Sequence, residues 1–371
     1  MAPGQAESPL TVCPHTPGRL DAAHNTAIDS THSGAVPTAQ TPPGPAIQPA
    51  GRLLFIINSA SGRQDSETTR TAIEAALQAA GRHADLIFTE PKKLAGAARD
   101  AAATAKARGS AVVAVGGDGT INAVAQAAHA QGCAMGVVPQ GTFNYFARSH
   151  GIPTGTAEAT ALLLGATPVP VQVGMVNDRV FLVNASLGLY PELLQDREAY
   201  KARFGRSRLV AFASALVTLL GSQRQLRLGI EQGSGTRSVT TPTLFVGNNR
   251  LQLEQVGVRH APTLDTGSIA AVMLRPIGTL AMLGLVWHGA MGTLGEADSV
   301  ETFEFRRMVV RIRMPLRRRG IKLAVDGEVG WMRPPLVFQV SERPLHLLKP
   351  QADSDAPSPG IDPTARGEGA A

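Results

Sequence analysis

The sequence predicts two lobes: an α/β lobe built on a doubly wound parallel sheet, then a mainly β, sandwich-like lobe. In residues 51–168, short apolar runs alternate with helical patterns, which is typical of β–α–β units with right-handed crossovers. In residues 169–350 the pattern changes to apolar–polar alternation, which indicates antiparallel strands with one exposed face. Residues 1–50 and 351–371 lack apolar periodicity and are predicted to be disordered tails. Whether residues 1–50 belong to the mature protein stays open.

Strands and helices alternate along the predicted α/β lobe. Each strand is a short continuous apolar run, as expected for a strand that is buried on both faces, and the helices carry apolar residues at helical spacing. The predicted strands are 53–57, 84–88, 111–115 and 135–138. The predicted helices are 66–80, 92–107, 120–130, 145–149 and 157–164.

Strands dominate the predicted second lobe. They are 169–173, 180–184, 225–230, 236–246, 269–274, 301–314, 322–325 and 336–340. Two apolar helical segments, 209–220 and 280–291, interrupt them. These segments are interpreted either as core or as walls of an acyl-chain pocket.

Composition narrows the classes of partner. The 371-residue chain has 35 Lys and Arg against 29 Asp and Glu, a net charge of +6 that fits an anionic partner such as a nucleotide, an anionic lipid or a nucleic acid. Aromatic residues make up 4% of the chain, which argues against base-stacking platforms, so no nucleic-acid partner is predicted. Two cysteines exclude a disulfide scaffold and indicate a reduced, cytoplasmic setting. No secretory signal is present, and no apolar run reaches the roughly 20 residues of a membrane span.

The most informative stretch is AVVAVGGDGTIN at residues 111–122, where a buried strand breaks into a glycine-rich loop. Gly116, Gly117 and Gly119 allow close approach of the backbone to a ligand, and the helix that follows Thr120 directs N–H groups to the same place. This pattern predicts a phosphate cradle. Asp118 is the acid of the loop, and its expected role is to hold a metal ion or to accept a proton from a hydroxyl. The alternative is a plain strand-to-helix turn.

Two further loops follow strands of the same predicted sheet, the NSASGR stretch at 58–63 and the PQGTFN stretch at 139–144. Because ligands bind at the carboxyl edge of open parallel sheets, we expect all three loops to meet there. A VDGE turn at 325–328 adds two carboxylates. Residues two apart in an extended chain share a face, so Asp326 and Glu328 are both expected to face the cleft. The alternative is a hairpin turn that prefers Asp-Gly.

Four landmarks together resemble the diacylglycerol kinase catalytic family. They are NSASG at 58–62, GGDGTIN at 116–122, PQGTFNYFAR at 139–148 and VDGE at 325–328. The resemblance covers about residues 52–350 and extends to bacterial lipid kinases, sphingosine kinases and, more distantly, NAD kinases and phosphofructokinases. It implies transfer of the γ-phosphoryl group from the co-substrate ATP to a lipid hydroxyl, with Mg²⁺ as cofactor and the nucleotide between the lobes. Diacylglycerol is the expected acceptor and phosphatidate the product, a step of phospholipid biosynthesis.

The resemblance also suggests roles for individual residues. The general base is assigned to Asp118 first and Glu328 second, and the metal to Asp118 and Asp326. The nucleotide is assigned to loop residues at the sheet edge and to the VDGE turn: Asn58, Gly62, Arg63, Gly116, Gly117, Gly119, Thr120, Gly141, Thr142, Asn144 and Asp326.

The chain departs from the family pattern in several places. Arg63 stands where a lysine is common, Ala123 where Glu is common and Tyr145 where Asp is common. Asp265 alone remains of an aspartate-rich stretch, so a structural magnesium site seen in some bacterial members is not expected.

Other readings remain open from sequence alone. An NAD kinase-like enzyme and a degenerate nucleotide- or lipid-binding member without turnover are the alternatives to a lipid kinase. Basic clusters at Arg203, Arg206 and Arg208 and at 317–319 fit either anionic headgroups or a solvated surface. The expected location is the cytoplasm, peripheral to the inner face of the membrane and in contact with the lipid substrate. The sequence leaves open which lipid is the acceptor and whether the protein forms a homodimer.

Overall fold

The structure is a computed structural model that describes residues 45, 51–59, 63–188, 225–233, 235–255, 267–276, 299–312 and 320–350. The chain divides into two compact units, Met1–Pro42 and Pro43–Ala371, and all described residues belong to the second. Several predicted features lie outside the described residues. These are the tails, the two helical segments of the second lobe, Gly62, Asp265 and both basic clusters.

A six-stranded sheet with the order β2-β1-β3-β4-β18-β5 forms the first lobe. Its strands are β1 (Leu53–Asn58), β2 (Ala84–Thr89), β3 (Ala111–Gly116), β4 (Ala134–Pro139), β5 (Thr167–Val171) and β18 (Leu345–Lys349). The neighbours from β2 to β18 pair in parallel, and β5 pairs antiparallel with β18. Every residue of β3 and β4 is buried, as their continuous apolar runs require. The predicted parallel α/β lobe is confirmed.

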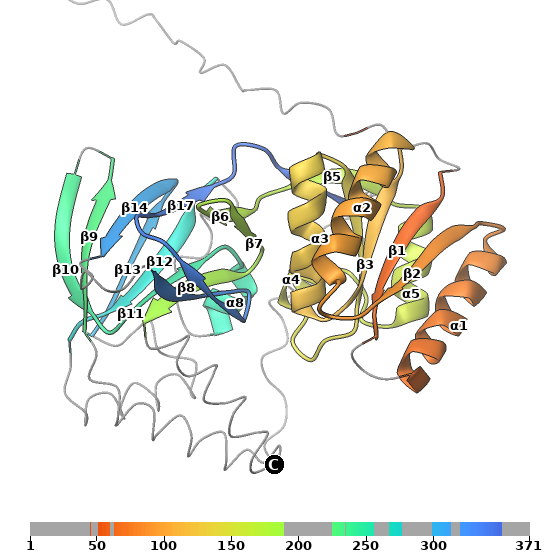
Figure 1. Cartoon of the computed structure of the whole chain (residues 1–371), viewed down its shortest axis with the longest axis horizontal. Helices are drawn as coiled ribbons and strands as arrows, with labels where there is room; N and C mark the ends of the chain where they lie inside the picture. Colours follow the sequence, from red (N-terminus) through yellow and green to blue (C-terminus); the bar gives the residue numbers. More distant parts are fainter. Residues whose placement is uncertain are drawn as a thin grey trace, which may run out of the picture. The chain divides into compact units, whose positions relative to one another are not determined.

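Helices cover both faces of this sheet. They are α1 (Arg63–Ala79), α2 (Leu94–Ala107), α3 (Asp118–Gln131), α4 (Tyr145–Ser149) and α5 (Thr156–Leu164). Helices α2 and α3 pack against each other on one face, and α1 and α5 pack together on the other (Figure 1). Alanines are four of the five buried residues of α2 and three of the eight of α3, and such small side chains let the two helices approach closely.

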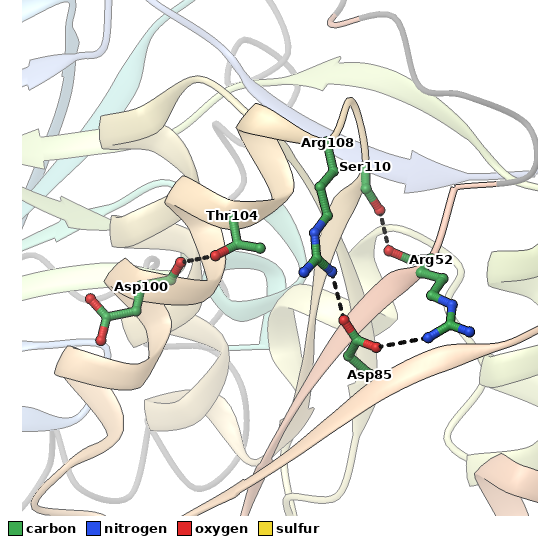
Figure 2. A network of polar contacts seen from close by, with 6 residues as sticks. All are labelled: Arg52, Asp85, Asp100, Thr104, Arg108 and Ser110. Carbon is green, nitrogen blue, oxygen red and sulfur yellow. Dashed lines mark hydrogen bonds and ion pairs between the residues drawn. The ribbon is translucent and has the colours of Figure 1, made fainter.

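The edge of the sheet away from the glycine-rich loops is held by polar contacts (Figure 2). Ser110 Oγ donates to the Arg52 carbonyl at 2.5 Å, and Arg108 Nη1 lies 2.7 Å from Asp85 Oδ2. Arg52 completes the cluster with a longer ion pair of 3.7 Å to Asp85. These groups are partly exposed, so each ion pair contributes roughly 0–1 kcal/mol and the buried strands carry the stability.

The sheet of the first lobe takes strands from beyond the predicted boundary at residue 168. Strand β5 crosses that boundary, and β18 returns from the end of the described chain to pair in parallel with β4, with His346 opposite Ala134. The sequence reading missed β18 because pairing between segments so far apart leaves no local signal. Strand β5 is an edge strand, which suits Pro168 and Pro170 because proline lacks the N–H that an inner strand needs.

Two antiparallel sheets form the second lobe, with the orders β10-β9-β14-β17-β6-β7 and β13-β12-β11-β8-β15-β16. The strands of the first are β6 (Gly174–Val176), β7 (Arg179–Phe181), β9 (Leu226–Gln232), β10 (Gly235–Thr241), β14 (Arg307–Ile312) and β17 (Leu336–Val340). Those of the second are β8 (Asn184–Gly188), β11 (Thr243–Gly247), β12 (Ile269–Leu274), β13 (Val300–Phe305), β15 (Ile321–Val325) and β16 (Glu328–Met332). A short helix, α8 (Arg250–Gln255), follows β11. Both sheets contribute to one apolar core, including Phe338, Ile230, Leu187 and Leu244, so the predicted sandwich is confirmed.

Three predicted strands prove to be two strands each. The predicted strand 236–246 divides at Pro242 into β10 and β11, which belong to different sheets. The predicted strand 301–314 divides at Arg306 into β13 and β14, again in different sheets. The predicted strand 180–184 divides between β7 and β8. Each break is a corner where the chain passes from one sheet to the other, and alternation continues across it.

Among the described residues, no helix has both the length and the apolar character needed to cross a membrane.

Candidate active site

The carboxyl ends of β1, β3 and β4 meet at one edge of the first sheet, because the three strands are parallel neighbours. Asn58, the last residue of β1, donates from Nδ2 to Thr120 Oγ1 at 3.0 Å. Gln140, just after β4, donates its backbone N–H to the Gly116 carbonyl at 2.8 Å. The structure therefore brings together the three loops that the sequence placed at this edge.

Two glycines let the second and third loops touch backbone to backbone. A Cβ atom on Gly141 would lie 3.0 Å from the Cα of Gly117, and one on Gly117 would lie 3.5 Å from the Cα of Gly141. Gly116 has a φ of 157°, and a Cβ there would lie 2.6 Å from Thr120 Oγ1. Side chains at these positions would separate the loops, so the glycines define a narrow floor of backbone groups at the start of α3.

Asn144 shapes the third loop. It adopts the left-handed conformation with φ 48°, which asparagine tolerates better than most residues. Its Oδ1 accepts from the Gly141 N–H at 2.9 Å, and its Nδ2 donates to the Gly141 carbonyl at 2.8 Å. The Asn144 side chain is thus occupied within the loop, whereas Thr142 is exposed on it.

Asp118 begins α3 and lies between these loops. Burial raises the pKa of its carboxyl, and a hydrogen bond from the Asn144 backbone N–H acts in the opposite direction. Its Oδ1 is enclosed and has no hydrogen-bond partner in the described part of the chain. An enclosed carboxylate oxygen without a donor is ready to accept a proton or a cation from a ligand.

Glu328 brings the second lobe to the same place. It is the first residue of β16, and its side chain lies against the first turn of α3, where a Cβ on Gly119 would come within 2.9 Å of Glu328 Oε1. Gly119 therefore makes room for this carboxylate. In the structure, Glu328 therefore lies beside the glycine-rich loop, on the side where it was expected.

Asp326 points elsewhere, and the expectation that it faces the cleft beside Glu328 is wrong. Asp326 and Gly327 have φ values of 47° and 87° and form the two-residue turn between β15 and β16, so the alternation rule for extended chain does not apply to them. The hairpin alternative is the correct one.

The carboxylate of Asp326 is enclosed by four N–H donors. Oδ1 accepts from the backbone of Val183 and Asn184, both at 2.9 Å, and Oδ2 accepts from the backbone of Leu182 at 2.8 Å and from Asn122 Nδ2 at 2.7 Å. Burial raises the pKa of this carboxyl, and the four donors lower it in part. With its acceptor positions used, Asp326 has no oxygen left for magnesium or for a nucleotide.

Sequence reasoning missed a polar stripe on α3 that contacts the second lobe. Asn122 also donates to the Val180 carbonyl at 3.0 Å, and Gln126 bonds the backbone of Asp178 at 3.2 Å and of Val180 at 2.7 Å. His129 Nε2 lies 2.8 Å from Ser341 Oγ. The signal was present, since the stripe repeats at i, i+4 and i+7 on a helix that is otherwise rich in alanine.

A cleft of about 940 Å³ opens beside Glu328 and the two glycines that flank Asp118. Its walls include Gly117 and Gly119 of the loop, apolar side chains of α2 and α3, the turn between β6 and β7, and the face of β16 that carries Glu328 and Met332. A cleft that joins a backbone cradle, the carboxylate of Glu328 and an apolar wall suits a nucleotide better than a purely apolar ligand.

The donors around this cleft fit a magnesium ion that is shared with phosphates. The described residues contain no group of three or more His, Cys, Asp or Glu that could hold a metal by itself. Magnesium in phosphoryl-transfer sites uses one or two carboxylates together with phosphate oxygens and water. The carboxylate of Glu328, beside the first turn of α3, supplies one such ligand.

Comparison with known proteins relates the chain to lipid kinases. The model of the diacylglycerol kinase catalytic domain matches residues 52–176, which contain the first three landmarks. A probable lipid kinase YegS-like of Pseudomonas aeruginosa is 40% identical over 302 residues, covering 75% of this chain and 87% of that protein. A probable lipid kinase YegS-like of Klebsiella pneumoniae is 44% identical over 79 residues, a match that spans 27% of its length and 21% of this chain.

Solved structures confirm the fold independently. A putative diacylglycerol kinase from Bacillus anthracis superposes with a TM-score of 0.62 at 20% identity, covering 81% of this chain and 97% of that one. A second structure of a putative diacylglycerol kinase from the same organism gives a TM-score of 0.60 at 18% identity. At these identities the likeness establishes the two-lobe architecture.

Proposed function

The chain belongs to the diacylglycerol kinase catalytic domain family, and we propose on that basis that it transfers the γ-phosphoryl group of ATP to a lipid hydroxyl. The proposed acceptor is diacylglycerol and the proposed product is phosphatidate. The observation that carries the proposal is the enclosed, unpartnered Oδ1 of Asp118 at the start of α3, beside the glycine backbone floor.

The backbone groups hold the phosphates in this proposal. The N–H groups at the start of α3, next to Gly117, face the γ-phosphate, and the helix dipole favours its negative charge. The acceptor oxygen approaches in line with the bond that breaks. Phosphoryl transfer depends chiefly on such positioning and on charge neutralisation.

Asp118 is the general base. It accepts the proton of the lipid hydroxyl while the acceptor oxygen bonds to the γ-phosphorus, and the bond from that phosphorus to the oxygen bridging to the β-phosphate breaks and releases ADP. Burial raises the pKa of Asp118, which strengthens it as a base relative to a solvated carboxylate.

Glu328 is the second carboxylate. It lies across the first turn of α3 from Asp118 and would hold magnesium together with phosphate oxygens. The ion, when bound, neutralises charge on the phosphates. Because the acceptor is dissolved in a bilayer, the protein acts at a membrane surface.

Transfer of radiolabel from γ-labelled ATP tests this function. Wild type, Asp118→Asn and Glu328→Gln are offered magnesium and a panel of diacylglycerol, monoacylglycerol, a long-chain base and NAD, with the lipids in detergent micelles. Asp100→Asn is the control, because Asp100 is exposed on α2 away from the cleft. We expect labelled phosphatidate from wild type and from the control, and a loss of about 10²- to 10⁴-fold in Asp118→Asn with ATP binding retained.

Each other outcome has a definite meaning. Label in another lipid corrects the acceptor and keeps the kinase. Label in NADP, or ATP binding without any labelled product, overturns the proposal in favour of an NAD kinase-like enzyme or a binding protein. Full activity of Asp118→Asn removes this residue from the role of base.

A further inference from the structure

One face of β16 forms the second-lobe wall of the cleft. Side chains alternate along a strand, so Glu328, Gly330 and Met332 lie on the same face. Glu328 and Met332 both line the cleft, whereas Trp331 on the other face is 69% exposed. Gly330 therefore leaves a gap in this wall between two side chains.

The guanidinium of Arg179 occupies that gap. Arg179 is the first residue of β7, and it lines the cleft. A Cβ on Gly330 would lie 3.4 Å from Arg179 Nη1, so the guanidinium lies over the glycine and a larger residue would push it away. The missing side chain at Gly330 is thus matched to the long side chain of Arg179.

The backbone around Arg179 is pinned to α3 on both sides. Gln126 donates to the Asp178 carbonyl and accepts from the Val180 N–H, and Asn122 donates to the Val180 carbonyl. Asn122 lies one turn and Gln126 two turns after Asp118. Arg179 is therefore held at a fixed place beside the first two turns of the helix on which the phosphates are expected to rest.

Arg179 has no ion-pair partner within the described parts of the chain, where five other arginines are paired with acids. A second arginine of the cleft, Arg99, lies on α2 beyond Leu94 and Ala95. Arg99 is exposed, whereas Arg179 lies against Gly330 of β16.

We propose that Arg179 binds the phosphate chain of the nucleotide, so that the second lobe supplies a cation to a cradle built by the first. The inference rests on the proposed function. The family resemblance alone predicts Arg63 as the cation at the nucleotide. A guanidinium presents several N–H donors in a planar fork, which suits phosphate oxygens.

Calorimetric titration of wild type and Arg179→Ala with ATP, ADP, AMP and adenosine tests the proposal. Loss of a charge-assisted hydrogen bond weakens binding about 10- to 100-fold, so we expect this loss for ATP, a smaller one for AMP and none for adenosine. Arg179→Lys keeps the charge without the fork and is expected to lie between. Arg227→Ala, an exposed arginine on β9, is the control and binds all four ligands as wild type does.

The outcomes separate this inference from the proposed function. If wild type binds no ATP, both fail. If wild type binds ATP and Arg179→Ala binds it equally well, or loses ATP and adenosine to the same extent, only the role of Arg179 is overturned. Thermal unfolding without ligand shows that the variants are folded, and Arg179→Lys provides the answer if the alanine variant is not.

Discussion

Replacing Asp326 with asparagine is expected to lower the free energy of unfolding by about 2 to 4 kcal/mol. The carboxylate accepts two N–H bonds on each oxygen, and asparagine keeps one oxygen, so two of the four donors lose their acceptor. Each buried donor without a partner costs about 1–3 kcal/mol. The lower part of the summed range applies, because the variant also avoids the cost of desolvating a charge.

Urea unfolding followed by circular dichroism measures this loss. Asp100→Asn is the matched control, since its exposed side chain makes no such bonds and a change within about 0.5 kcal/mol is expected. Asn122→Ala removes one of the four donors, and the double variant Asn122→Ala/Asp326→Asn measures how strongly the two side chains are coupled. Residues in one hydrogen-bond network couple by about 0.5–3 kcal/mol.

Two results would refute the reasoning. The first is an unchanged free energy of unfolding in Asp326→Asn, which would mean that the enclosed carboxylate contributes nothing. The second is strict additivity of the Asn122 and Asp326 variants, which would mean that the contact between α3 and the β15–β16 turn is not formed. A loss of transferase activity in a variant that remains folded would show that the turn also positions Glu328.

Three further predictions concern titration and packing. Burial raises the pKa of Asp118, so its contribution to stability is present below the ordinary pKa of 3.8 and is lost as pH rises through the pKa in the folded state. Asp118→Asn should therefore have a higher melting temperature than wild type at pH 8, and the difference should vanish in acid. A wild type that melts at the higher temperature at pH 8 would contradict this. Desolvation, with a smaller effect of Lys349, lowers the pKa of His150 from 6.5 to about 4. The free energy of unfolding of wild type should therefore fall by up to about 3 kcal/mol as pH falls from 6.5 to about 4, and that of His150→Gln should fall less. Urea unfolding at each pH measures both. Gly119→Ala should reduce phosphoryl transfer at least about tenfold, because the added Cβ would lie 2.9 Å from Glu328 Oε1. Its thermal stability should be kept or raised, because alanine favours the helix. Unchanged kinetics would exclude the contact with Glu328.

The parts of the fold with local signals were predictable. Apolar runs bounded by glycine-rich loops identified β1, β3 and β4, and parallel pairing follows from strictly alternating strands and helices. The meeting of Gly117 and Gly141 at one edge follows from the same topology. The strand pairs in the sandwich were less accessible, because continuous alternation through Pro242 hides the corner between β10 and β11.

The parts that failed depend on backbone geometry or on distant contacts. Asp326 was assigned to the cleft by a rule for extended chain, but a left-handed turn directs it into the junction of the lobes. Arg179 belongs to no motif, and its place follows from hydrogen bonds that α3 makes to the flanking residues. The stripe of Asn122, Gln126 and His129 could have been predicted, because these polar residues fall on one face of an alanine-rich helix.

The return of β18 to the first sheet has a consequence for synthesis on the ribosome. Strand β18 lies between β4 and β5, so the lobe that carries Asp118 lacks an inner strand until residues 345–349 have emerged. Until then β4 exposes an unpaired edge in a chain that already holds the glycine-rich loops. Nascent chains of this protein should therefore gain protease resistance in the first lobe only at the end of translation, and truncation before β18 should destabilise the lobe farthest from it in sequence.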